Sequence, residues 1–323
     1  MYEWHRQIQA MIEEIDASIR RRDDESLTLH ALAHQLGYSD FHMTKKFHEI
    51  TGLPLRTYLR ARRLAFALWE VRDTERRLLD IALDYGFSSH EAFSRAFKAE
   101  YDVSPASYRR KPVAVVLRTR IAAFDRYAFG MEEISMKTSS GQINVYFTTI
   151  PAHKFLYIRN NVSNGYWDFW QHHATIPGQD CDTICGLIDS IPGKLDDMGT
   201  GDISSGAGQI MAYEAAPDGG KFDCYPVPRW ECYGCRVPVD YDGPVPEQML
   251  LRDVPEGEYI VFEHGPFDYE TECRSVEFAI DAAWEKFDWR DTDYEFDPTM
   301  GRMYYFYMDP AHCWKELWPV RRK

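Results

Sequence analysis

Two stretches of the first 112 residues share one pattern of apolar and polar positions. Residues 29–63 (LHALAHQLGYSDFHMTKKFHEITGLPLRTYLRARR) align with residues 78–110 (LLDIALDYGFSSHEAFSRAFKAEYDVSPASYRR) at an offset of 49, which becomes 50 after one inserted residue. In each copy apolar residues recur at helical spacing, stop at a glycine and then resume. Such self-similarity predicts a duplicated unit of helix, tight turn and helix.

Small residues and glycine mark the turn of each copy. Ala33 and Gly37 align with Ala82 and Gly86. A small side chain lets the second helix cross closely, and glycine readily adopts the left-handed conformation that ends a helix. The run Ser88-Ser89-His90-Glu91 fits a capping box that opens the second helix of the later copy. The spacing is that of a helix-turn-helix.

The second helix of each copy has one apolar and one polar face by the 3.6-residue period. The predicted inward positions are Met43, Phe47 and Ile50, and in the later copy Ala92, Phe93, Ala96 and Phe97. The predicted outward positions are Phe41, Thr44, Lys45 and His48, and in the later copy His90, Glu91, Ser94, Arg95 and Lys98. Each outward face carries a hydroxyl followed by a cation. An aromatic on the first outward face suits contact with a thymine methyl group.

A long helix between the copies, LRTYLRARRLAFALWEVRD, can begin after Pro54 and carries Arg56, Arg60, Arg62 and Arg63. If it is rigid, it holds the two second helices at a fixed separation. Successive major grooves on one face of DNA lie about 34 Å apart, so one chain could read two of them. The alternative is a pair of helical hairpins with solvated charges that forms an interaction module. The duplicated turn and the matched cations favour DNA.

Residues 8–110 resemble the DNA-binding domain of the AraC/XylS family of transcription regulators. The similarity lies in GYSDFHMTKKFHEITGLPLRTYLRARRL and in the string that includes Leu79-Asp80-Ile81-Ala82. It implies two helix-turn-helix motifs that read adjacent major grooves. By position, it implies base contacts from Phe41, Thr44, Lys45, His90, Glu91, Ser94 and Arg95. Lysine stands at 45 and 46 where arginine is common, and because lysine lacks the bidentate fork, weaker base selectivity is expected there.

Formal charge changes along the chain where the pattern changes. The net charge is −14, yet residues 1–112 hold 18 Lys and Arg against 17 Asp and Glu, which leaves 19 against 34 for residues 113–323. The first part can therefore approach a polyanion, whereas the second repels it and attracts cations. We predict a first domain over 1–112 that is all α-helical, a linker or extra strand over 113–142, and a second domain over 143–323.

The second domain is predicted to be α+β. INVYFTTI, KFLYIRN, EYIVFEH and RMYYFYM are rich in β-branched and aromatic residues, and helical patterns occur near 165–175 and 272–288. IPAHKFLYI at 150–158 is echoed by VPEGEYIVF at 254–262, an offset of 104. This weaker repeat predicts two similar β-rich halves with a central groove, a common place for a ligand.

The last strand pattern, CWKELWPVRRK, places Trp314, Glu316 and Trp318 on one face. A carboxylate between two indoles is costly to bury unless a cation or a hydrogen-bond donor meets it. One interpretation is an edge strand with an exposed glutamate. The other is an aromatic-walled acidic site for a cationic or amphipathic small molecule. The acidity of residues 113–323 favours the second.

IPAHKFLYIRN, VPEGEYIVFEHG and ELWPV resemble the GyrI-like effector-binding fold, which follows many AraC-type DNA-binding domains. The resemblance implies a small organic effector, often a lipophilic cation, and makes Glu316 its partner. This sequence lacks the aliphatic residue that the family usually has between the aromatic and the proline, which leaves the direction of Glu316 open. Aromatic character suggests further wall residues, namely Tyr166, Trp167, Trp170, Trp230 and Tyr305.

The sequence also offers metal binding and hydrolysis as alternative functions. Cys181, Cys185, Cys232 and Cys235 could form a zinc site, but buried thiols fit the spacing better, and no metal or other cofactor is expected. Because the sequence shows neither a signal peptide nor a run of 18 apolar residues, a cytoplasmic protein without a membrane partner is expected. The expected partners are double-stranded DNA, a small-molecule effector and RNA polymerase. Two alternatives stay open: a GyrI-like hydrolase that uses Glu316 as a general acid or base, and a DNA-binding regulator that needs no ligand.

Overall fold

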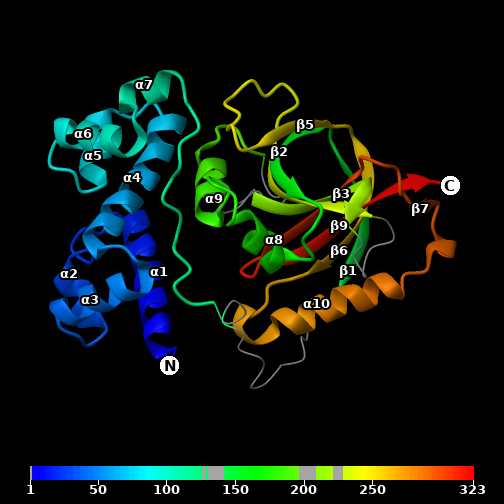
Figure 1. Ribbon diagram of the computed structural model, residues 1–323, viewed down its shortest axis with the longest axis horizontal. Helices are drawn as coiled ribbons and strands as arrows, with labels where there is room; N and C mark the ends of the chain where they lie inside the picture. Colours follow the sequence, from blue (N-terminus) through cyan, green and yellow to red (C-terminus); the bar gives the residue numbers. More distant parts are fainter. Residues whose placement is uncertain (1, 126–128, 130–141, 196–208, 221–227) are drawn as a thin grey trace. The chain divides into compact units, whose positions relative to one another are not determined.

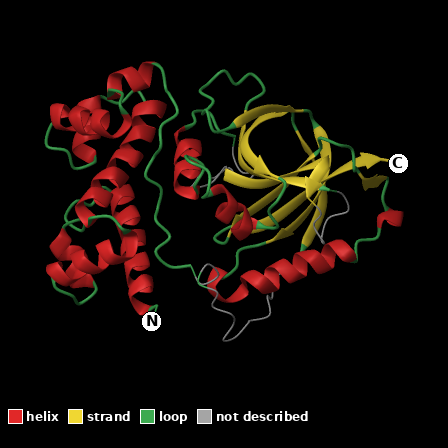
Figure 2. Cartoon of the chain, in the orientation of Figure 1, coloured by secondary structure: helices red, strands yellow, loops and turns green. Residues whose placement is uncertain are grey.

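The computed structural model describes residues 2–125, 129, 142–195, 209–220 and 228–323. Cys224 and half of the predicted linker, 126–128 and 130–141, lie outside the described residues. The chain divides into two compact units. The first comprises residues 1–131 and 182–192, and the second comprises residues 132–181 and 193–323. Figure 2 shows helices in the first unit, and a sheet with accompanying helices in the second.

Residues 3–110 fold into seven helices: α1 (Glu3–Arg21), α2 (Leu29–Gln35), α3 (Asp40–Thr51), α4 (Leu55–Asp73), α5 (Leu78–Asp84), α6 (His90–Tyr101) and α7 (Pro105–Arg110). Helices α2 and α5 begin 49 residues apart, and α3 and α6 begin 50 residues apart. The predicted pair of helix-turn-helix motifs is confirmed. Helix α4 joins them, and Figure 1 shows one motif towards each of its ends.

The turns form as the sequence predicts, with one correction. Gly37 and Gly86 follow the first helix of each motif, and both have a φ of +75°, where a Cβ would be strained. Ser89 Oγ accepts a hydrogen bond from the backbone N–H of Ala92 at 3.1 Å, so it caps α6. The predicted capping box is wrong in register, because a cap at Ser89 puts Ala92, not Glu91, at the third helical position.

The two motifs bury equivalent side chains. Met43, Phe47, Phe93 and Phe97 are all fully buried, as predicted for the inward faces of α3 and α6. The ring of Phe47 lies 5.5 Å from that of Tyr58 on α4. In the second motif, the ring of Phe97 lies 5.9 Å from that of Tyr108 on α7. The same aromatic pair therefore closes each motif.

Helix α9 (Cys181–Ser190) contributes residues 182–190 to the first unit, although the sequence pattern groups them with 143–323. Arg72 of α4 donates from Nη1 to the carbonyl oxygens of Ser190 at 2.9 Å and Ile191 at 3.2 Å. A Cβ on Gly186 would lie 2.3 Å from the carbonyl oxygen of Leu117, so only glycine allows this approach. Residues 112–123 run past α9 without strand structure, which corrects the predicted extra strand over its described part.

The second unit is built on one antiparallel sheet. Its strands are β1 (Asn144–Ile150), β2 (His153–Asn160), β3 (Gln209–Gly220), β4 (Arg229–Val237), β5 (Leu250–Val254), β6 (Gly257–His264), β7 (Tyr294–Phe296), β8 (Met303–Asp309) and β9 (Cys313–Arg322). The order is β1-β6-β9-β8-β3-β4-β2-β5, and β7 pairs with β9. Figure 1 shows the sheet strongly curled. Strand β9 pairs with β6 and β8 on its two sides, so the interpretation of the last strand as an edge strand is wrong.

The strand order has the symmetry that the weak repeat suggests. Strands β2 and β6 begin and end 104 residues apart, and the order reads alike from either side of the β3–β8 pair. A helix follows each of them, α8 (Tyr166–His173) and α10 (Tyr269–Glu285). Strand β1 pairs with β6 and β5 pairs with β2, so each half lends its first strand to the other. This exchange ties the two halves into one sheet.

The two faces of the sheet differ. One, the core face, carries an apolar cluster that includes Tyr259, Tyr305 and Leu317. The other, the helix face, is where α8 and α10 pack: Trp170 of α8 lies 4.8 Å from Tyr233 of β4, and Trp284 of α10 stacks at 4.0 Å on Trp318 of β9. Among the described residues, no helix combines the length and apolarity needed to cross a membrane.

Candidate DNA interface and ligand-binding face

The outward face of α3 presents an aromatic ring beside cations that are already engaged. Phe41 is 81% exposed, so folding gains little from it. Thr44 donates its hydroxyl proton to the carbonyl oxygen of Asp40 at 2.8 Å, which leaves the hydroxyl oxygen as an acceptor. Glu49 Oε2 accepts from Lys46 Nζ at 2.8 Å, and Glu49 Oε1 lies 3.8 Å from Lys45 Nζ. Lys45 can therefore reach a phosphate or a base only by leaving Glu49.

The outward face of α6 presents a cation with fewer competing contacts. Arg95 is exposed, and the described residues include no carboxylate within ion-pair distance of it. Ser94 Oγ lies 3.4 Å from His90 Nε2, one turn earlier. Hydrogen bonds from its own backbone N–H and from Ser89 lower the pKa of Glu91, so this carboxylate stays ionised at the helix start. An ionised Glu91 can accept from a cytosine amino group.

The helix that joins the motifs is less basic on its surface than the sequence suggests. Arg62 is 4% exposed and donates to both carboxylate oxygens of Asp16 on α1, at 2.8 and 2.6 Å. Arg63 pairs with Asp24 at 2.7 Å. Of the four predicted arginines, Arg56 and Arg60 are exposed. Half of the predicted basic set therefore serves the packing of the first unit.

Glu316 lies on the helix face in a row of side chains that crosses the sheet. Cross-strand pairing joins Phe262, Glu316, Phe306, Met211 and Tyr233 in this order, from β6 to β4. The two ends of the row lie under helices, because Phe262 contacts Trp284 of α10 and Tyr233 contacts Trp170 of α8. Between them Glu316 and Phe306 are only partly buried. Glu316 thus lies in the part of the face that neither helix seals.

Two indoles hold the Glu316 carboxylate. Trp314 Nε1 donates to Oε1 at 3.5 Å and Trp318 Nε1 donates to Oε2 at 3.3 Å. Burial and the nearby carboxylates, Asp281 ahead of Glu277, raise the pKa of Glu316 to about 7 despite these bonds. Asp281 and Glu277 lie one turn apart on α10. No ion pair within the described residues includes any of the three. Burial and Asp281 raise the pKa of Glu277 by more than Arg274 lowers it.

The structure separates the predicted wall residues into two groups. Tyr305 lies on the core face, where its hydroxyl is 2.6 Å from His153 Nε2. Trp230 also packs against the core cluster, under the guanidinium of Arg159 at 3.7 Å. These two are not brought together with Glu316. Tyr166, Trp167 and Trp170 lie on α8, whose Trp170 packs on the helix face, and the first two are about two-fifths exposed.

The cysteines do not converge. Cys232 and Cys235 lie three residues apart on β4, so their side chains point to opposite faces of the sheet. Over the described part of the chain, no three His, Cys, Asp or Glu side chains are arranged to hold a metal ion.

Residues 32–111 match the protein family described as "Helix-turn-helix domain". The regulatory protein SoxS of Salmonella typhimurium is 41% identical over 108 residues, which make up 33% of this chain and 97% of SoxS. The chain belongs to the AraC/XylS family of transcription regulators. It is a DNA-binding transcription regulator of the helix-turn-helix type.

A second relative is similar over a smaller share of its own length. The transcriptional regulator Rob of Salmonella typhimurium is 44% identical over 87 residues, 27% of this chain and 30% of Rob. Among solved structures, the EcmrR C-terminal domain is 13% identical, covers 57% of this chain and 100% of its own, and has a TM-score of 0.32.

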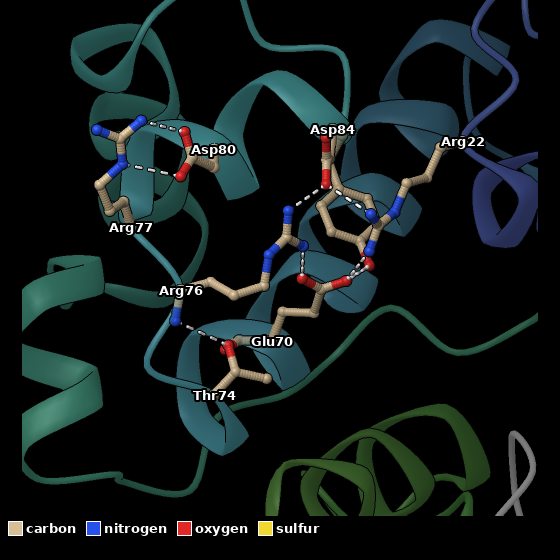
Figure 3. Close-up of polar contacts among 8 residues, drawn as sticks. Arg22, Glu70, Thr74, Arg76, Arg77, Asp80 and Asp84 are labelled. Atoms are coloured by element: carbon tan, nitrogen blue, oxygen red, sulfur yellow. Dashed lines mark hydrogen bonds and ion pairs between the residues drawn. The ribbon is translucent and has the colours of Figure 1, made fainter.

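An ion-pair network fixes the second motif of this AraC/XylS chain to the helix that joins the motifs. Arg22, at the end of α1, lies 2.6 Å from Glu70 of α4 and 2.7 Å from Asp84 of α5. Arg76 bridges the same two carboxylates, and Tyr85 donates its hydroxyl to Glu70 at 2.9 Å. Figure 3 shows the two guanidinium groups between the two acids. The network joins three helices that are distant in sequence.

Glu70→Gln is expected to lower the free energy of unfolding by about 1 kcal/mol, because it removes the negative charge shared by two arginines and replaces one of the two acceptor oxygens by a donor. Urea unfolding measures the loss, which should shrink in high salt because ion pairing is screened. The matched control is Asp80→Asn, which breaks the exposed Arg77–Asp80 pair at 2.8 Å in the same region (Figure 3). Equal effects of the two substitutions would mean that the network adds nothing to an ordinary surface pair.

Sequence analysis missed several residues of the helix face. Three of them lie on α10, namely Trp284, Glu277 and Asp281. The sequence predicts this helix but not the face of the sheet on which it packs. Phe306 lies on β8, which the sequence predicts as a strand from its aromatic residues without indicating a role for Phe306. The sequence signal for these residues is a pair of carboxylates at i and i+4 near a tryptophan. The same pattern is equally typical of a solvent-exposed helix face.

Proposed function

We propose that this AraC/XylS regulator reads duplex DNA through α3 and α6, binds a small organic cation at Glu316, and changes its DNA binding when the cation is bound. The proposed base contacts come from Phe41, Thr44 and Lys45 on α3 and from His90, Glu91, Ser94 and Arg95 on α6. None of the seven is buried, and all lie in the N-terminal half of each second helix, which supports this role because that half of a recognition helix faces the base edges.

The position of Glu316 carries the effector half of the proposal. Its carboxylate is held by two indole N–H groups, is flanked by two further acids, and has no cationic partner among the described residues. Removing a carboxylate from water without a cation is costly, and adjacent like charges add to that cost. A cation with an aromatic or aliphatic body would neutralise Glu316 and pack on Trp314, Trp318 and Phe306. The GyrI-like resemblance of the sequence supports the same assignment.

The affinity for such a cation is expected to rise with pH. Below pH 7 Glu316 is mostly protonated and neutral, whereas above pH 7 it is ionised. For a permanently charged ligand, the ionised fraction of Glu316 grows about tenfold between pH 6 and pH 8 if the carboxyl titrates near 7. The dissociation constant should therefore fall by up to the same factor.

A route for coupling is present in the chain itself. Within the described residues, the backbone passes between the units at 181–182 and 192–193. Residues 182–192 are bonded within the first unit to α4, the helix that joins the two motifs, through Arg72 and through Trp69, whose Nε1 donates to the Asp189 carbonyl at 3.2 Å. A ligand that favours one arrangement of α8 could thus act on α4, and the change in DNA affinity is limited by the difference in ligand affinity between the two states.

Benzyltriethylammonium is a suitable probe, because its charge does not titrate. Calorimetry on the full chain at pH 6 and pH 8 should show tighter binding at pH 8. Glu316→Gln should weaken binding at pH 8 and remove the pH dependence. Glu295→Gln is the control, since this half-exposed carboxylate of β7 pairs with Arg321 at 2.8 Å. Fluorescence anisotropy with promoter DNA, with and without the probe, measures the coupling.

Three outcomes would contradict parts of the proposal. Equal binding by the wild type and Glu316→Gln would remove Glu316 from the site. Conversion of a bound compound to product would favour the hydrolase, with Glu316 as its general acid. Failure of any organic cation to bind or to shift the melting temperature would favour a regulator that needs no ligand.

A further inference from the structure

Helix α2 of the first motif carries two exposed histidines one turn apart. His30 and His34 are four positions apart, so both side chains lie on the same side of the helix. Their ring centroids are 5.9 Å apart, and the two rings are tilted by 41° relative to each other. The side chain of His30 is 80% exposed, and His34 is exposed as well. Solvent and dissolved ions can therefore reach both imidazole rings.

Packing of the motif does not account for this pair. The duplicated second motif has Leu79 and Leu83 at the equivalent positions of α5, and these leucines are 42% and 52% exposed. The side chains that α2 buries are those of Leu32 and Ala33. The fold of a motif therefore does not require histidine at either position, and an exposed pair gains little from burial.

A carboxylate selects the ring nitrogen that His30 offers to solvent. Nδ1 of His30 lies 3.4 Å from Oδ1 of Asp40, the first residue of α3. A neutral imidazole that donates from Nδ1 to this carboxylate keeps its lone pair on Nε2. Metal-binding histidines are commonly held in this way, by a carboxylate at the second ring nitrogen. Within the described residues the ring of His34 makes no hydrogen bond, so it too can offer a lone pair.

The separation of the two rings suits one shared metal ion. A metal bound at about 2.1 Å by one imidazole nitrogen lies roughly 3.2 Å from the ring centroid, so two rings that bind one ion stand up to about 6.4 Å apart. The observed 5.9 Å lies within this limit. We propose that His30 and His34 chelate one divalent transition-metal ion of the Zn²⁺ and Ni²⁺ class, with Asp40 holding His30 in place. Imidazole selects such ions over Mg²⁺ and Ca²⁺, which prefer oxygen ligands.

A bound ion stabilises the first motif. Helix α2 has only seven residues, and a helix of this length is marginal without further contacts. An ion that bridges consecutive turns binds the folded helix in preference to the unfolded chain, so it raises the melting temperature by mass action. The site includes neither the proposed base contacts nor Glu316. It can therefore fail while the proposed function stands, and the reverse also holds.

Ni²⁺–nitrilotriacetate is a suitable probe, because the chelator leaves two adjacent positions on the ion and so favours a pair of imidazoles over a single one. Calorimetry on the untagged full chain should show saturable binding. His30→Gln and His34→Gln should each weaken it about tenfold or more, because the chelate is reduced to one ligand. Asp40→Ala should weaken it about tenfold, because His30 loses the carboxylate that orients it. His48→Gln is the control, since His48 is a single exposed histidine on α3, and should leave binding unchanged.

Thermal unfolding gives a second measurement. The probe should raise the melting temperature of the wild type but not that of the double variant His30→Gln with His34→Gln, and an excess of Mg²⁺ should not compete. The proposal is overturned if the wild type does not bind the probe, or if the double variant binds it as tightly, because the ion then lies elsewhere on the chain. Unchanged binding by Asp40→Ala would remove the carboxylate from the site. Both histidines are exposed, so the double variant is expected to fold, which circular dichroism checks.

Discussion

Replacing Asp16 by alanine is expected to lower the free energy of unfolding by about 3–5 kcal/mol, the cost of leaving a buried charge without its partner. Asp16 and Arg62 are 2% and 4% exposed, and two hydrogen bonds join them. The third contact of Arg62, from Nη1 to the Arg118 carbonyl at 2.5 Å, cannot neutralise a full charge. Urea unfolding followed by circular dichroism measures the loss.

The double variant Asp16→Ala with Arg62→Met separates a buried charge from lost packing. Removing both charges should recover part of the stability, because no unpaired ion stays in the core. Glu14→Ala is the surface control, since Glu14 pairs with Arg21 on the same helix and is partly exposed. If the double variant is as unstable as Asp16→Ala alone, packing of the Arg62 side chain rather than charge pairing accounts for the loss.

The Asp16–Arg62 pair shows which parts of the fold the sequence can predict and which it cannot. Helical periodicity correctly predicted both motifs, because the inward residues of α3 and α6 recur at helical spacing and no other element is needed to define them. Arg62 follows Tyr58 by four residues and so falls on the buried stripe of α4. An arginine on an apolar stripe was the signal that it serves packing. Its partner on α1, 46 residues earlier, could not be predicted from local pattern.

In the second unit, alternation predicted which residues share a face of a strand, but not which face. Trp314, Glu316 and Trp318 do lie together, as the two-residue period requires. Tyr305 and Trp230 lie on the core face instead. The face that a residue occupies depends on how neighbouring strands pair, and the register pairs Tyr305 with Leu317 rather than with Glu316. Strands β3 and β4 were not predicted, because their segments mix alanine, glycine and charged residues.

The predicted domain boundary at residue 112 is a further case in which local pattern does not predict tertiary contacts. Composition and charge change there, yet residues 113–125 stay with the first unit, and Val115 and Leu117 are buried in its core. Residues 182–192 also belong to that unit. The helical period predicts which side of a helix is buried, but not which element packs against that side. The structure shows that the backbone at Leu117 covers α9, because its N–H donates to the Gly186 carbonyl at 3.2 Å.

Arg95→Ala is expected to weaken binding to a specific DNA site by about 1–3 kcal/mol and to relax the preference at one base pair. Arg95 is exposed on α6 and is not held by an acid at ion-pair distance within the described residues. Its fork can therefore meet the two acceptors of a guanine without first breaking a bond in the protein. Fluorescence anisotropy against a duplex selected from a random library, and against its single-base variants, measures both effects.

Lys45→Ala at the equivalent position of α3 should cost less and change the sequence preference little. Lys45 makes a single-point contact, and it must leave Glu49, 3.8 Å away, to reach the duplex. Lys98→Ala, near the other end of α6, is the control for charge alone and should weaken all duplexes about equally. If Arg95→Ala also weakens all duplexes alike and lowers the salt dependence by about one ion, Arg95 contacts a phosphate, and base selection by α6 belongs to His90, Glu91 or Ser94.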